Sequence, residues 1–250
     1  MTVVSDGSGT WTALRDDEVV GRLRTLVRPD RRRFLLIRDD TGMAYGPLLD
    51  AALPMLGGDV RVEVDEDADE VRTVLADRGF RVDRREHRYV IPTDRVVASG
   101  LPAGFDVVSA ADADVDRWRE LDDALRQDVP GTAGWRNDPA EFVAREAGDP
   151  EFDPATYLLA VRQGNGEYAG LARVWDRPNM PRLGLIGTLP RYRRQGLAVA
   201  LIAQVFGVLG QRGRREVCCE VDVANAASNA LMGRLRAQRV GGNVELILVS

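Results

Sequence analysis

A short basic loop between an apolar segment and an apolar helix constrains this sequence more than any other feature. The loop reads Arg193-Arg194-Gln195-Gly196-Leu197-Ala198. Residues 182–189 are predicted to form a strand that ends at Pro190, and residues 196–209 place apolar side chains on one side of a helix. A strand, a tight loop and a helix in this order point main-chain N–H groups and the positive helix end at one place. The pattern therefore predicts a pyrophosphate-binding site.

Residue types around the loop exclude two other phosphate-binding motifs. The chain contains no lysine, so a nucleotide-binding loop of the Gly-Lys-Ser/Thr type is impossible. The glycine spacing is not that of a dinucleotide-binding fold. Small residues at 196 and 198 let an anion approach the main chain. The alternative interpretation is a basic loop at a helix start that binds no ligand.

Two segments of the sequence resemble the GNAT superfamily of acetyl-CoA-dependent N-acetyltransferases. The first is residues 188–198, and the second is residues 220–231, in which a strand ends close to Asn225. The resemblance covers roughly residues 101–250. It implies direct transfer of an acetyl group from acetyl-CoA to a primary amine of a small molecule or peptide, with no metal. It also implies an α/β (α+β) fold, with a mixed, mostly antiparallel sheet flanked by helices.

The resemblance assigns separate tasks to the main chain and to one side chain. The loop would hold the pyrophosphate, and the main chain around residue 188 would pair with the pantetheine arm and present an N–H to the carbonyl oxygen. Asn225 would contact the pantetheine or adenosine part, or it would instead cap the helix that starts at residue 226. The expected coenzyme-binding residues are Ile186, Gly187, Thr188, Arg193, Arg194, Gln195, Gly196, Leu197, Ala198 and Asn225.

The catalytic groups are less well defined than the coenzyme site. Met232 stands where many GNAT enzymes carry a tyrosine that protonates the departing thiolate. Ser228, one helical turn earlier, could orient a water, although a cap or surface role is the alternative. Glu220 is a candidate base, alongside Asp222 and Asp176, and each of these would otherwise be a solvated carboxylate.

Acceptor specificity is expected from the first helix, the loop after it and the second helix of this half. The segment carries carboxylates and one aromatic residue that would suit a cationic amine. The alternative is an acidic helix face that serves solubility. The residues concerned are Asp122, Asp123, Asp128, Trp135 and Glu141. Patterning predicts strands at 105–109, 157–162, 167–175 and 182–189, and helices at 112–126 and 139–147.

A distant internal repeat links the two halves of the chain. Glu63-Val64-Asp65 recurs as Glu220-Val221-Asp222, and each copy belongs to a unit that reads strand, helix, short turn and strand. The predicted elements are 60–64, 69–77 and 80–91 in the first copy, and 217–223, 226–237 and 244–249 in the second. We therefore expect two domains. Residues 1–98 would form a truncated, degenerate GNAT-like domain, and residues 99–250 an acetyl-CoA-binding catalytic domain.

The first half is expected to bind no coenzyme. Its nearest counterpart of the basic loop, residues 39–46, has two aspartates where the anion would lie, and carboxylates repel a pyrophosphate. A hairpin is predicted from segments 19–27 and 33–38, preceded only by a leader rich in glycine and serine. This half would be structural, covering an edge or face of the catalytic half.

Composition limits the partners and the location. The net charge is −5 and the arginines alternate with acidic residues, so a nucleic-acid surface is not expected. No apolar run approaches the roughly 20 residues that span a bilayer, so no membrane partner is expected. Cys218 and Cys219 are adjacent on a predicted strand and should point to opposite faces, which argues against a disulfide and for a cytoplasmic location. Oligomeric state is left open, a homodimer included. A non-catalytic acyl-CoA-binding module and the use of another acyl donor are the competing functions.

Overall fold

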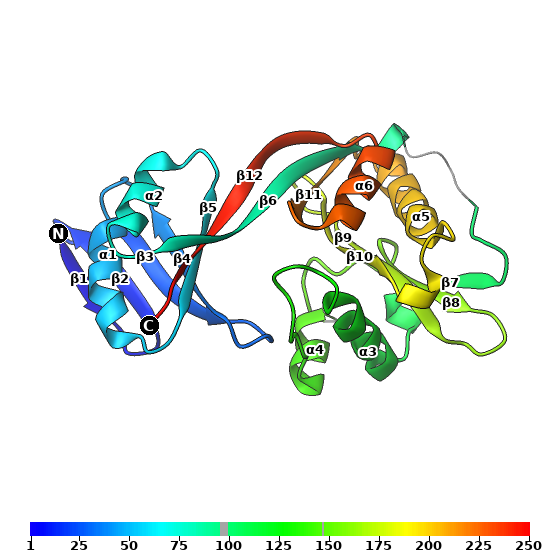
Figure 1. Cartoon of the computed structure of the whole chain (residues 1–250), viewed down its shortest axis with the longest axis horizontal. Coiled ribbons are helices and arrows are strands. Elements are labelled where there is room, and N and C mark those ends of the chain that lie inside the picture. Colours follow the sequence, from blue (N-terminus) through cyan, green and yellow to red (C-terminus); the bar gives the residue numbers. More distant parts are fainter. Residues whose placement is uncertain (96–99, 147) are drawn as a thin grey trace. The chain divides into compact units, whose positions relative to one another are not determined.

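The computed structural model describes residues 1–95, 100–146 and 148–250, which divide into two compact units (Figure 1). The first unit comprises residues 1–86 and 241–250, and the second comprises residues 87–240. The predicted boundary between residues 98 and 99 lies outside the described residues, as does the predicted helix end at residue 147. Residues 241–250 fall in the first unit, whereas the sequence pattern predicts them in the second domain.

The first unit is a sheet with two helices. Its elements are β1 (Thr2–Ser5), β2 (Thr10–Arg15), β3 (Glu18–Val27), β4 (Arg33–Asp39), α1 (Tyr45–Ala52), a 3-10 turn (Leu53–Met55), β5 (Val60–Asp65), α2 (Asp69–Ala76), the start of β6 (Arg81–Pro92) and the end of β12 (Gln238–Leu248). The strand order is β1-β2-β3-β4-β5-β12-β6. β4 and β5 are parallel, and β12 is antiparallel to β5 from Asn243 to Leu248. The C-terminal strand therefore completes the first unit.

Residues 2–15 form two strands, so the expectation that only a glycine- and serine-rich leader precedes the hairpin was wrong. β1 and β2 are antiparallel, and the glycine- and serine-rich segment is the turn between them. Trp11 and Ala13 alternate with polar residues on β2 and are buried, which is the period of a strand with one face in a core. The glycine and serine residues of the turn, taken as a leader, drew attention away from this alternation in the sequence.

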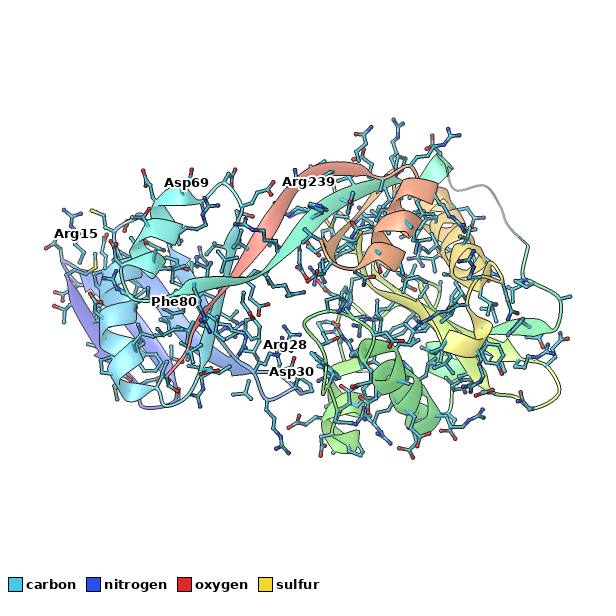
Figure 2. The ribbon with its side chains drawn as sticks, in the orientation of Figure 1. Arg15, Arg28, Asp30, Asp69, Phe80 and Arg239 are labelled. Atoms are coloured by element: carbon cyan, nitrogen blue, oxygen red, sulfur yellow. The ribbon has the colours of Figure 1, made fainter. Side chains whose placement is uncertain are left out.

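One face of this sheet packs against both helices. Leu48 and Leu49 of α1 and Leu75 of α2 are fully buried against alternate residues of the strands. Phe80, which follows α2 and is labelled in Figure 2, belongs to the same core. The apolar alternation of β5 thus explains why α1 and α2 lie on one side of the sheet.

The second unit is a sheet covered on both faces. Its elements are the end of β6, a 3-10 turn (Thr93–Arg95), β7 (Phe105–Ser109), a 3-10 turn (Ala110–Asp112), α3 (Val115–Arg126), α4 (Pro139–Glu146), β8 (Tyr157–Arg162), β9 (Tyr168–Trp175), β10 (Arg182–Thr188), a 3-10 turn (Pro190–Tyr192), α5 (Leu197–Gln211), β11 (Glu216–Asp222), α6 (Ala226–Arg234) and the start of β12. The strand order is β6-β11-β10-β9-β8-β7. β10 and β11 are parallel, and β7 to β10 are antiparallel neighbours.

Alternating residues of β8 show that the helices lie on opposite faces of the sheet. Leu158 packs in the core formed with α5 and α6, whereas Leu159 packs in the core formed with α3 and α4. The fold is therefore the expected α/β (α+β) class, a mixed and mostly antiparallel sheet flanked by helices. Within the described ranges, no helix is both long and apolar enough to cross a membrane.

The structure bears out the repeat at the turns that follow α2 and α6. Gly79 has a φ of +85° and Arg236 a φ of +53°, so both adopt the left-handed conformation that ends a helix. The next N–H in each copy, of Phe80 and of Ala237, donates to a carbonyl five residues earlier. Glycine therefore fits the first turn without strain, whereas arginine is strained in the second.

Candidate functional site

β10 and β11 separate soon after they begin. They pair at Arg182 and Cys218, whereas β10 stays paired with β9 as far as Thr188. The N–H of Leu189 donates to the carbonyl of Ala169, toward the β9 side. Because successive N–H groups of a strand point to opposite sides, that of Thr188 points toward the β11 side. Ile186, Gly187 and Thr188 thus line an open strand edge, as an extended ligand would need.

The basic loop presents free N–H groups next to this edge. Arg194 and Gly196 have φ values of +61° and +89°, which turn the chain sharply before α5. In the part of the chain that the structure describes, no hydrogen bond is found for the N–H groups of residues 194–198. These groups precede and begin a helix of 15 residues. The loop can therefore accept an anion without breaking an existing bond.

Side-chain contacts hold the loop in place. Arg193 donates to the carbonyl of Thr188 at 3.1 Å and forms an ion pair with Asp128. Glu167 pairs with Arg191 and accepts a hydrogen bond from the hydroxyl of Tyr192. These long-range partners, Asp128 and Glu167, were not anticipated, because nothing local in the sequence marks them.

Within the loop, each predicted residue has a distinct environment. Arg193 is engaged with Asp128, whereas Arg194 is exposed and has no ion pair among the described residues. Gln195 donates to the carbonyl of Arg191 at 3.3 Å. A Cβ built on Gly196 would meet no atom within 4 Å, which leaves open space above the N–H groups. Leu197 is buried in the core, Ala198 is half-buried, and together they anchor the helix start.

Asn225 caps α6. Its side-chain oxygen accepts a hydrogen bond from the N–H of Ser228 at 3.0 Å, as the alternative interpretation expected. The Asn229 side chain donates to the carbonyls of Asp222 and Asn225, and it accepts from the Tyr89 hydroxyl at 3.0 Å. A coenzyme contact by Asn225 stays a prediction.

The candidate catalytic residues are mostly engaged elsewhere. Glu220 pairs with Arg182 at 2.7 Å, at the start of β10 where β10 and β11 are still paired. Asp176 pairs with Arg212 and Arg214, and Asp222 accepts from the N–H of Ala224. Ser228 is half-buried in the first turn of α6. The geometry therefore offers Glu220 little support as a base, while Ser228 keeps an uncommitted hydroxyl in the described structure.

Met232 and Cys219 belong to the core. Both side chains are 2% exposed, and their sulfur atoms lie 3.5 Å apart. Burial raises the pKa of the Cys219 thiol to about 12, so it stays protonated. The methionine thus fills space beside α5 and β11, and Cys218 and Cys219 are both free thiols.

The acidic residues of α3 fix the loop that follows it. Asp122 and Asp123 are buried and accept hydrogen bonds from the side chain of Asn137, and Asp123 also accepts from its N–H. Arg126 pairs with Asp122 and lies over the ring of Trp135 at 4.3 Å. Asp122 and Asp123 therefore hold the loop instead of forming a solvated face, a role that neither sequence interpretation included.

A groove of about 680 Å³ lies between α3, the loop after it and the end of β10. It contains both signs of charge, so it does not favour a cation by charge alone. Its lining residues are Arg119, Glu120, Asp123, Ala124, Gln127, Asp128, Arg136, Leu189, Pro190 and Arg191.

A buried ion pair fastens α4 to the sheet. Arg173 of β9 and Glu146 of α4 are 5% and 6% exposed and form a salt bridge, and the Tyr157 hydroxyl donates to the same carboxylate. Burial lowers the pKa of Arg173, but Tyr157 and Glu146 outweigh it and raise the value above its ordinary level. The guanidinium is therefore charged inside the unit.

Comparison with known proteins identifies a family for the second unit. Residues 118–236, which include β8 to β11, the loop and α5, match the family model described as the acetyltransferase (GNAT) family. The chain contains a GNAT-family acetyltransferase domain. Acetyltransferases of this family use acetyl-CoA. Mycothiol acetyltransferase from Clavibacter sepedonicus is 30% identical over 135 residues, which is 54% of this chain and 43% of that protein. The chain thus matches less than half the length of this curated relative.

Solved GNAT structures share the fold over nearly the whole chain. A GCN5-related N-acetyltransferase from Sphaerobacter thermophilus has a TM-score of 0.74 at 20% identity, covering 98% of this chain and 82% of its own. A tandem GNAT protein from the clavulanic acid biosynthesis pathway has a TM-score of 0.72 at 16% identity, covering 96% and 82%. At these identities the likeness is one of fold.

Proposed function

We propose that the second unit transfers an acetyl group from acetyl-CoA to a primary amine of a small molecule or peptide. The observation that carries the proposal is the free N–H row of residues 194–198 beside the open edge of β10. The row suits the diphosphate, and the edge suits the pantetheine arm as an added strand. Ile186, Gly187 and Thr188 would line the arm, and Asn225 would border it.

The chemistry would be direct attack. The amine attacks the thioester carbonyl, a tetrahedral oxyanion forms, and coenzyme A leaves as a thiolate. The N–H of Thr188, which points toward the β11 side, would stabilise the oxyanion. The thiolate is a fair leaving group. A water oriented by Ser228 would pass to it the proton that the attacking amine nitrogen loses, in place of the absent tyrosine.

The coenzyme site is tested by a pair of glycine variants. Gly196→Glu puts bulk and a negative charge at the anion site, so we expect acetyl-CoA binding to be lost in a calorimetric titration. Gly164→Glu is the matched control, because Gly164 also has a φ of +89° and a Cβ placed on it would meet no atom within 4 Å. It lies in the turn between β8 and β9 and should bind normally. Equal affinity for acetyl-CoA in both variants would show that the loop is not part of the coenzyme site.

A non-catalytic acyl-CoA-binding module is the second candidate. Buried Met232 favours it, because that side chain cannot give a proton to the thiolate. Release of free thiol from acetyl-CoA across a panel of amines separates the candidates. Tight binding without turnover on any amine would support the module, and turnover with longer acyl-CoA donors only would indicate another acyl group. The cytoplasmic location stays a prediction.

A further inference from the structure

The two units contain corresponding loops. In the first unit, parallel β4 and β5 pair at Arg33 with Val60 and at Phe34 with Arg61, and residues 40–44 then lead into α1. In the second unit, parallel β10 and β11 pair at Arg182 with Cys218, and residues 189–196 lead into α5. Each loop thus follows the first strand of a parallel pair and begins a helix that packs on the sheet.

The loop of the first unit already holds an anion. One carboxylate oxygen of Asp39 accepts hydrogen bonds from the N–H groups of Ala44 and Tyr45, both at 2.8 Å. The other oxygen accepts from the N–H of Thr41 at 3.0 Å and from its hydroxyl at 3.1 Å. The loop N–H groups that are free in the second unit are therefore bonded in the first.

Two further N–H donors of this loop are also used. The N–H of Asp40 donates to the carbonyl of Val20 at 3.0 Å, and that of Met43 donates to the Thr41 hydroxyl at 3.3 Å. Burial raises the pKa of Asp39, but the hydrogen bonds from Thr41, Tyr45 and Ala44 outweigh it and lower the value. The group is ionised at neutral pH, which is the state that a helix N-terminus favours.

We infer that the carboxylate of Asp39 fills the anion site of the first unit from within the chain, so that the protein binds one coenzyme molecule and not two. This inference rests on the proposed function of the second unit. A carboxylate attached to the same chain has a high effective concentration at the loop, and a free diphosphate would have to displace it. Exposed Asp40 adds a like charge next to the same place.

Calorimetric titration with acetyl-CoA tests the number of sites. We expect one molecule per wild-type chain and none for Gly196→Glu. Two molecules per chain, or one that survives in Gly196→Glu, would overturn the inference about Asp39. No binding to the wild type would instead overturn the proposed function, so the two failures are distinguishable.

Rescue by a free anion tests the role of the carboxylate itself. Asp39→Ala should melt at a lower temperature than wild type in a buffer without oxyanions, and inorganic phosphate should raise its melting temperature more than that of wild type. Asp40→Ala is the control, because the Asp40 carboxylate pairs with exposed Arg38 and lies outside this set of bonds. Asp39→Asn keeps one acceptor and should fall between, which provides a measurement if Asp39→Ala does not fold. Equal phosphate responses in all four proteins would overturn the inference.

Discussion

Single residues set the backbone conformation at both ends of the helices in this protein. At the starts of α6 and α1, an acceptor side chain satisfies otherwise free N–H groups, Asn225 for α6 and Asp39 for α1. At helix ends, a left-handed residue turns the chain, and here the two copies of the repeat differ. Gly79 carries no steric penalty, whereas Arg236 does. This difference predicts how replacement of Arg236 changes stability.

Replacing Arg236 by glycine should stabilise the protein. The left-handed conformation costs a non-glycine residue roughly 1–2 kcal/mol, and part of this gain is lost to the greater freedom of glycine in the unfolded chain. We expect a net gain of about 0.5–1 kcal/mol in thermal or chemical denaturation. Arg234→Gly, two residues earlier within α6, is the control and should lower stability by about 1 kcal/mol. A loss of stability in Arg236→Gly would contradict the argument.

At the scale of elements, periodicity predicted most strands and helices of the second unit. The strands β7 and β8 match their predicted bounds, and α5 begins one residue after its predicted start. Prediction from local composition failed where glycine or serine residues of a turn separate or interrupt strands. The glycine- and serine-rich turn concealed β1 and β2, and Gly241-Gly242 concealed the first half of β12. A side chain on Gly242 would clash with the carbonyl of Glu86 at 2.4 Å, so this glycine allows close strand approach.

The site was predictable to the extent that it depends on local main chain. The loop from Arg193 to Ala198 could be found because strand, loop and helix are consecutive in sequence. The carboxylates that pair with the loop could not be found in this way, because Asp128 and Glu167 are distant from it in the sequence. The buried roles of Asp122 and Asp123 depend on Asn137, which only the folded chain brings to α3. Exposed and buried carboxylates look alike in a sequence.

Removing one partner of the ion pair between α4 and β9 should strongly destabilise the protein. Glu146→Leu leaves the guanidinium of Arg173 buried without its carboxylate, so we expect a loss of about 3–5 kcal/mol in chemical denaturation. Glu141→Leu changes an exposed glutamate of the same helix and should stay within about 0.5 kcal/mol of wild type. The double variant Glu146→Leu/Arg173→Met should regain part of the loss. If Glu146→Leu were as stable as Glu141→Leu, the argument about the buried charge would be contradicted.

At the scale of the whole molecule, the first unit depends on the last strand of the chain. β12 lies between β5 and β6 in the sheet of that unit, and Val244 is fully buried in its core. Val244→Asp should therefore unfold the first unit, with amide hydrogen exchange rising in β2 to β5. Val249→Asp is the control, because Val249 is 48% exposed, and it should leave exchange unchanged. Normal protection of β2 to β5 in Val244→Asp would contradict this dependence.

The position of β12 has a consequence for folding during synthesis. Residues 1–86 leave the ribosome before the second unit, and β5 then has β4 on one side but no neighbour on the other until residues 243–248 have emerged. An unpaired strand edge in a growing chain invites pairing with other nascent chains. The first unit is thus begun before the second unit and completed after it, so translation speed through the second unit sets how long that edge stays exposed.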